Sequence, residues 1–218
     1  MTEPYSGCLI TFEGIDGSGK TTQIRRLDKE LTREGLKPVL SREPGGTPLG
    51  ASVRELLLAQ DPPISPLSEL FLFLADRAQH IEQVIRPALQ SGRIVLVDRF
   101  TDATVAYQGF GMGHPLSLLD TLHRTVLGRI RPAKTFLFDL PFEAAKERVH
   151  RRPGSETRIE KRGEAFFEKV RRGYLELAIK EPERFVVLDA TLSEEELAIR
   201  ILMELRPHLP DGSGKRKS

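Results

Sequence analysis

The sequence predicts an α/β fold: a three-layer sandwich in which a central parallel sheet is flanked by helices. Short apolar runs alternate with longer amphipathic stretches along the chain, a pattern typical of parallel strands joined by crossover helices. The run 93–97 is almost continuously apolar and rich in β-branched residues, as expected for a central strand buried on both faces. A glycine-rich segment lies between the first apolar run and the first amphipathic stretch.

The expected elements follow one another in a regular order. Strands are predicted over 8–12, 38–41, 93–97, 134–139 and 185–188. Helical patterns cover 21–35, 66–91, 115–128 and 193–206. The last helix begins with three glutamates at 194–196, and negative charge in a first turn is favoured by the helix dipole.

Length and composition favour one globular enzyme-sized domain. The chain has 218 residues, of which 39% are hydrophobic and 29% charged. This length and composition are typical of a soluble globular protein with a sizeable core. We expect a single domain over 1–209 and a disordered tail over 210–218, which is rich in Gly, Ser, Lys and Arg. A net charge of +2 gives no reason to expect a nucleic-acid partner.

Other broad classes are also disfavoured. No secretion signal and no apolar run long enough for a membrane span is recognised, so we expect a cytoplasmic protein with no membrane partner. The one cysteine, Cys8, excludes an intrachain disulfide and a thiol-rich metal site.

The glycine-rich segment 14–21 reads Gly-Ile-Asp-Gly-Ser-Gly-Lys-Thr. Its glycines allow a tight turn whose N–H groups point into one concavity, at the positive end of the following helix. Lys20 is expected to reach the β- and γ-phosphates of ATP, and the Thr21 hydroxyl to ligate Mg²⁺. The segment predicts the phosphate-binding loop and the fold of the P-loop NTPases. The nucleotide-binding residues expected from it are Gly14, Ile15, Asp16, Gly17, Ser18, Gly19, Lys20, Thr21 and Thr22.

Asp98 is the candidate second magnesium ligand. It closes the apolar strand 93–97, and parallel sheets place their ligand sites at the carboxyl ends of the strands. An aspartate in this position is as often a helix cap as a ligand. Because a phosphate-binding loop is also present and Arg99 follows directly, we favour the ligand.

A P-loop alone leaves kinases, GTPases, motors and transporter ATPases open. The guanine-recognition sequence Asn-Lys-x-Asp does not occur, which disfavours the GTPases. Arginines in or near glycine- and proline-punctuated segments, Arg42, Arg77 and Arg99, are suited to bind phosphates and planar carbonyl edges. Singly, each is more simply explained as a surface ion pair.

Four segments together resemble the bacterial thymidylate kinase family. They are the loop 13–22, Arg-Glu-Pro-Gly-Gly-Thr at 42–47, Asp-Arg-Phe at 98–100 and Ala-Tyr-Gln-Gly at 106–109, in the family's order and spacing. The resemblance extends from the first strand to about Thr191. It implies transfer of the γ-phosphoryl group of ATP to dTMP, giving dTDP and ADP with Mg²⁺, and it also implies a homodimer.

The resemblance assigns roles to individual residues. It implies that Phe73 stacks on the thymine ring while Arg77 binds a carbonyl edge; residues four apart on a helix can address one planar base together. The other implied acceptor residues are Asp16 at the 3′-hydroxyl, Arg42 and Arg99 at the phosphate, and Thr104, Tyr107 and Gln108 around the nucleoside. Asp189, Ala190 and Thr191 are implied to border the adenine.

A basic segment over about 146–162 is expected to form a mobile lid, because it contains five arginines interrupted by Pro-Gly-Ser. Closure would exclude water and bring positive charge to the transferring phosphoryl group. Some family members carry a catalytic arginine in the P-loop, where this chain has Gly17. The chain therefore resembles the lid-arginine subtype, in which Arg152 or Arg158 would act with Lys20 and Arg99.

Two other functions are disfavoured by the sequence. A deoxynucleoside kinase or a different nucleoside-monophosphate kinase is disfavoured by the segment 42–47 together with Phe73 and Arg77. An ATP-binding motor or regulatory subunit would hydrolyse ATP whether or not dTMP is present, and the short chain offers no partner domain for it.

Overall fold

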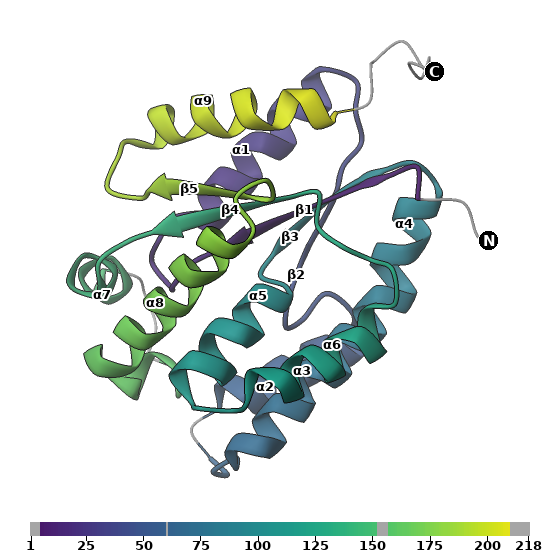
Figure 1. Ribbon diagram of the computed structural model, residues 1–218. Helices are drawn as coiled ribbons and strands as arrows, with labels where there is room; N and C mark the ends of the chain where they lie inside the picture. Colours follow the sequence, from purple (N-terminus) through teal and green to yellow (C-terminus); the bar gives the residue numbers. More distant parts are fainter. Residues whose placement is uncertain (1–4, 60, 152–156, 210–218) are drawn as a thin grey trace.

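The computed structural model describes residues 5–59, 61–151 and 157–209. Its centre is a parallel five-stranded sheet with the strand order β2-β3-β1-β4-β5 (Figure 1). The strands are β1 (Cys8–Glu13), β2 (Val39–Arg42), β3 (Ile94–Asp98), β4 (Lys134–Asp139) and β5 (Phe185–Asp189). Each lies within about two residues of its prediction, so the parallel α/β architecture is confirmed.

Helices cover both faces of this sheet, which gives the predicted three layers. The α-helices are α1 (Lys20–Arg33), α2 (Pro48–Leu58), α3 (Pro66–His80), α4 (Arg86–Gln90), α5 (Thr101–Thr104), α6 (Leu116–Leu127), α7 (Phe142–His150), α8 (Glu164–Lys180) and α9 (Glu194–Leu205). The described residues also form π-helical segments η1 (Ile81–Ile85) and η2 (Val105–Gly111) and the 3₁₀ turns η3 (Glu160–Arg162) and η4 (Arg206–His208). Figure 1 shows α1 and α9 on one face of the sheet, with α4, α5 and α8 on the other.

The helix expected over 66–91 is helical throughout but not uniform. Between α3 and α4 lies η1, a π-helical turn. Pro87 follows in the first turn of α4 and has no N–H to donate, so a local change of hydrogen-bond register accommodates it. The sequence pattern did not mark α2, α7 or α8 as helices. The apolar residues of α2 are interrupted by Gly50, and α7 and α8 are strongly charged.

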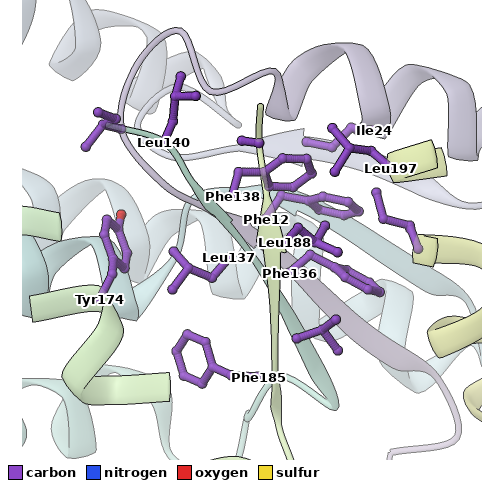
Figure 2. Close-up of a cluster of buried hydrophobic side chains, with 14 of the residues drawn as sticks. Phe12, Ile24, Phe136, Leu137, Phe138, Leu140, Tyr174, Phe185, Leu188 and Leu197 are labelled. Carbon is purple, nitrogen blue, oxygen red and sulfur yellow. The ribbon is translucent and has the colours of Figure 1, made fainter. Parts of the chain in front are cut away.

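Aromatic side chains fill the core beside β1 and β4. Phe12 and Phe136 are fully buried, and their ring centroids lie 5.5 Å apart. Figure 2 shows these rings, with Phe138, on the same side of the strands as Ile24 of α1 and Leu197 of α9. Burying such rings contributes strongly to stability because each removes a large apolar area from water.

Strand register determines where the site forms. In the parallel pair β1–β3, Phe12 lies opposite Asp98, and in β2–β3, Arg42 also lies opposite Asp98. The three strands therefore end at one edge of the sheet. The loop after β1, the turn after β3 and the segment after β2 meet there.

Within the parts of the chain that the structure describes, every helix is too short or too polar to cross a membrane.

Candidate functional site

The loop between β1 and α1 is shaped by glycines that no other residue could replace easily. Gly14, Gly17 and Gly19 have φ of 133°, 83° and 93°, in the range that side chains disfavour. A Cβ atom at Gly14 would also lie 2.5 Å from the carbonyl oxygen of Phe138. The backbone can therefore curl tightly around a phosphate, as the sequence predicts.

Lys20 is the first residue of α1, and its side chain reaches back to the start of this loop. Its Nζ donates to the carbonyl oxygens of Gly14 at 3.0 Å and Ile15 at 2.9 Å, and its residue is only 5% exposed. Burial, reinforced by the positive charge of Arg99, lowers the pKa of Lys20 to about 8. The hydrogen-bond partners of Lys20 are neutral carbonyl groups, so a bound phosphate would give this ammonium a negatively charged partner.

Thr21 and Asp98 are brought together as predicted. The Thr21 Oγ1 donates to Asp98 Oδ2 at 3.0 Å, although 77 residues separate them in the sequence. A hydroxyl and a carboxylate are oxygen ligands of the kind that Mg²⁺ prefers, and Mg²⁺ typically takes its remaining ligands from phosphates and water. This pair fits the predicted ion.

Arg99 follows Asp98 and lies between two hollows in the surface. Its Nη2 donates to Asp16 Oδ1 at 3.1 Å, and its Nη1 donates to the Tyr174 hydroxyl at 3.4 Å. The guanidinium carbon lies 5.0 Å from the centre of the Tyr107 ring, a cation–π distance. The head of Arg99 is thus held in one orientation while its side chain remains 16% exposed.

The first hollow is a cavity of about 370 Å³ between α3, α5, η2 and the segment after β2. Its lining includes most of the residues predicted to bind the acceptor: Asp16, Phe73, Arg77, Arg99, Thr104, Tyr107 and Gln108. The second hollow lies over the phosphate-binding loop and is also lined by Arg42, Thr22, Asp98 and Ala190. Asp16, Glu43, Arg54 and Arg99 line both, so the two hollows adjoin.

Arg77 is held rigidly at the first cavity. Its Nε donates to Glu43 Oε2 at 2.7 Å, its Nη1 to Thr104 Oγ1 at 2.9 Å, and its Nη2 to the Phe100 carbonyl at 2.9 Å. Only 1% of the residue is exposed. A buried guanidinium with a paired carboxylate is a fixed, charged donor surface, which is suited to recognising a planar polar ligand.

A comparison with protein families identifies the kinase family to which the chain belongs. The family model described as thymidylate kinase matches residues 12–201. The chain belongs to the thymidylate kinase family.

Individual thymidylate kinases are similar in sequence to this chain along nearly its whole length. It is 42% identical over 205 residues to the thymidylate kinase of Exiguobacterium sibiricum, covering 94% of this chain and 96% of the relative. It is 51% identical over 191 residues to that of Pseudomonas putida, covering 87% and 90%. The crystal structure of thymidylate kinase from Ehrlichia chaffeensis has a TM-score of 0.74 and 36% identity, covering 91% of this chain and 98% of that one.

The segment expected to form the lid lies only partly within the described residues. Residues 146–150 belong to α7, and Arg152 lies outside the described residues. Arg158 does not line the hollow over the phosphate loop: its Nη2 donates to Glu69 Oε2 at 2.7 Å, and Arg162 donates to the same oxygen at 2.6 Å. The predicted disordered tail, 210–218, also lies outside the described residues.

The residues expected around adenine are only partly brought to the phosphate-loop hollow. Ala190 lines it, but Asp189 and Thr191 do not. Instead, the N–H and hydroxyl of Thr191 both donate to Asp189 Oδ1, at 2.9 Å and 2.6 Å. This local turn precedes α9.

Two further arginines line the site: Arg148, predicted only as one of the five lid arginines, and Arg54, which had no predicted role. Arg148 of α7 donates to the carbonyl oxygens of Gly17 at 3.5 Å and Ala190 at 3.0 Å, over the phosphate loop. Arg54 of α2 donates to the Pro44 carbonyl at 3.0 Å and lines both hollows. Arg54 lies seven residues after the helix cap Thr47, a spacing that returns to the same helix face; this is the signal that could have found it.

Buried carboxyl groups surround the site and have altered acidity. Burial raises the pKa of Glu13 to about 7; the nearby Asp102 adds to this effect and Arg99 opposes it. Burial also raises the pKa of Asp76 to about 6, assisted by Glu43. Both pKa shifts arise mainly because a low-dielectric environment disfavours the charged form.

The lowered pKa of Lys20 leads to a prediction about nucleotide binding. Because phosphate favours the ammonium form, ADP with Mg²⁺ should raise this pKa and take up a fraction of a proton near pH 8. The affinity should fall about fivefold from pH 8 to pH 9, as the free protein loses the charged form. Calorimetry in two buffers of different ionisation enthalpy measures the uptake.

The matched control for this measurement is Lys20→Arg, which retains a positive charge that does not titrate in this range. It should bind ADP without the additional proton uptake. Equal proton uptake by the two proteins at pH 8 would contradict the assignment of the lowered pKa to Lys20.

Proposed function

We propose that the chain transfers the γ-phosphoryl group of ATP to dTMP, giving dTDP and ADP. The observation that carries the proposal is the junction of the two hollows at Asp16 and Arg99. A nucleoside triphosphate on the loop side and a nucleoside monophosphate in the 370 Å³ cavity would bring their phosphates together at this junction. Catalysis between bound phosphates depends mainly on such positioning.

The acceptor in this reaction is already a phosphate oxyanion, so no strong general base is needed. What the site must supply is donor groups and positive charge at the transferring group. In our assignment, Lys20 holds the β- and γ-phosphates of ATP. Arg99 and Arg42 hold the phosphate of dTMP, with Arg42 reaching it from the side of the phosphate-loop hollow. Asp16 is assigned to the deoxyribose 3′-hydroxyl.

Mg²⁺ is the cofactor that we propose for this site, held by Thr21 and Asp98. When bound, it neutralises charge on the phosphates of ATP. Asp98 already accepts the hydrogen bond from Thr21, so the two oxygens are close enough to ligate one ion together.

Selection of thymine deoxyribonucleotide is assigned to the inner wall of the cavity. Phe73 would stack on the base while Arg77 binds a carbonyl edge. Tyr107 is only 6% exposed and is surrounded by the edges of Phe166, Phe167 and Tyr174 at 6.0 to 6.3 Å between ring centroids. A ring held in this way cannot move aside for a 2′-hydroxyl, which favours deoxyribose.

The activity is tested by a coupled ADP-release assay with ATP and Mg²⁺. We expect turnover that depends on dTMP, with dUMP a poor second among dUMP, dCMP, dGMP, dAMP and UMP. ADP release without any acceptor, as a motor or regulatory ATPase would give, would refute the proposal, and preference for another monophosphate would refute the base-pocket assignment.

We infer further that an arginine of the segment 146–162, Arg152 or Arg158, supplies charge to the transferring group, because Gly17 cannot. Arg158→Ala and Arg152→Ala are expected to lower kcat, at least one of them by about 100-fold, since one charged group at a transferring phosphoryl contributes several kcal/mol. Arg151→Ala is the matched control: its side chain is 74% exposed and pairs with Glu147. Unchanged kcat in both test variants would overturn the lid-arginine assignment.

A homodimer is the assembly that we propose. Large apolar side chains are exposed along α2, α3 and α6, which neighbour one another in Figure 1: Leu49, Leu56, Leu67, Phe71, Leu116 and Leu118. A set of exposed apolar residues on adjacent helices is typical of a protein interface.

The expected cytoplasmic location stays a prediction.

Phe71→Glu tests this assembly because it places a charge in the middle of α3, where the ring is 50% exposed. We expect sedimentation velocity to show a dimer for the wild type and a monomer for the variant. Met203→Glu on α9, where the side chain is 69% exposed, is the control and should leave the dimer intact. A monomeric wild type at micromolar concentration would contradict the proposal.

A further inference from the structure

The turn that carries Arg99 has an unusual backbone. Arg99 has a φ of 70° and is the one non-glycine residue with positive φ in the described ranges. Such a conformation is unfavourable for a side chain and persists only where its surroundings hold it. The Arg99 N–H donates to the Phe12 carbonyl at 3.0 Å, but this bond alone does not fix the side chain.

Glu13 is buried directly behind this turn. Its Oε1 accepts from the Phe100 N–H at 2.7 Å, and its Oε2 accepts from the Tyr174 hydroxyl at 2.8 Å. The residue is completely buried and lines neither hollow. A buried carboxylate is costly unless donors satisfy it, and both of these partners are donors.

Tyr174 connects Glu13 to the guanidinium. Its hydroxyl accepts from Arg99 Nη1 at 3.4 Å while it donates to Glu13. The ring itself cannot shift easily, because the neighbouring Gly173 packs so closely that a Cβ there would lie 2.7 Å from the Phe110 ring. The carboxylate therefore acts on Arg99 from two sides: through the backbone of Phe100 and through the hydroxyl of Tyr174.

We propose that Glu13 is a positioning residue that, through Tyr174 and the Phe100 amide, directs the Arg99 guanidinium toward the phosphate of the acceptor nucleotide. This inference rests on the proposed function, which gives Arg99 that phosphate as its ligand. The carboxylate is required rather than an amide of the same shape. A glutamine could accept one hydrogen bond through its oxygen, but its NH₂ group cannot accept from Tyr174.

The test compares two ligands that differ only in the phosphate. Binding of dTMP and of thymidine to wild type, Glu13→Gln and Tyr174→Phe is measured by calorimetry at about pH 8, above the pKa of about 7 that burial gives Glu13, so that the carboxylate form predominates. We expect each variant to bind dTMP about tenfold more weakly, the effect of losing well-placed hydrogen bonds to a charged group, and to bind thymidine within about twofold of wild type. kcat with dTMP should fall as well.

Two further variants separate positioning from folding. In an Arg99→Met background, adding Glu13→Gln should change dTMP affinity by less than about twofold, because the residue that Glu13 positions is already gone. Asp139→Asn alters a carboxylate on the neighbouring strand β4, which pairs with Arg171 at 2.6 Å. It should lower the melting temperature without changing the ratio of dTMP to thymidine affinity.

Equal losses for dTMP and thymidine in Glu13→Gln would make Glu13 merely structural and overturn the inference. Unchanged dTMP affinity in that variant, or an undiminished effect in the Arg99→Met background, would also overturn it. A wild type that does not phosphorylate dTMP would instead overturn the proposed function. The two failures are thus distinguishable.

Discussion

Parallel pairing of β1 with β3 sets Phe12 opposite Asp98, and the rest of the site depends on this register. A shift by one residue would turn the side chains of either strand to the opposite face of the sheet. The phosphate-binding loop leaves β1 immediately after Glu13, and the turn with Arg99 leaves β3 immediately after Asp98. Because both strands are buried in the core, the apolar packing that stabilises the fold also fixes the separation of the phosphate-binding groups.

Three cationic groups of the site are held in place by neighbouring protein atoms. Lys20 is held by backbone carbonyls, Arg77 by Glu43, and Arg99 by Asp16 and Tyr174. Fixed charges of this kind need little reorganisation when a phosphate binds, and such preorganisation is a major source of catalytic stabilisation. The lowered pKa of Lys20 reflects the same arrangement, since its carbonyl partners compensate the buried charge only in part.

The features that could be predicted from the sequence are those encoded by a short contiguous segment. The P-loop is one contiguous segment, and the strands are short apolar runs, so both were predicted closely. The position of Asp98 at the end of β3 follows from the same signal. Contacts between distant segments were not visible. The pairing of Arg158 with Glu69 spans 89 residues, and the contact of Arg148 with the Gly17 carbonyl spans 131. Turn chemistry was missed as well: Asp189 and Thr191 bind each other rather than facing the phosphate-loop hollow.

The most direct measurement is a crystal structure of the protein with ADP, Mg²⁺, aluminium fluoride and dTMP. We predict that thymine lies between Phe73 and Arg77 and that the planar aluminium fluoride lies between the two nucleotides. Lys20 and Arg99 should both contact phosphate or fluoride. Mg²⁺ should lie beside Thr21 and Asp98. A dTMP molecule bound outside the cavity, or Arg99 turned away from its phosphate, would contradict the view that strand register and buried pairing build the phosphoryl-transfer site.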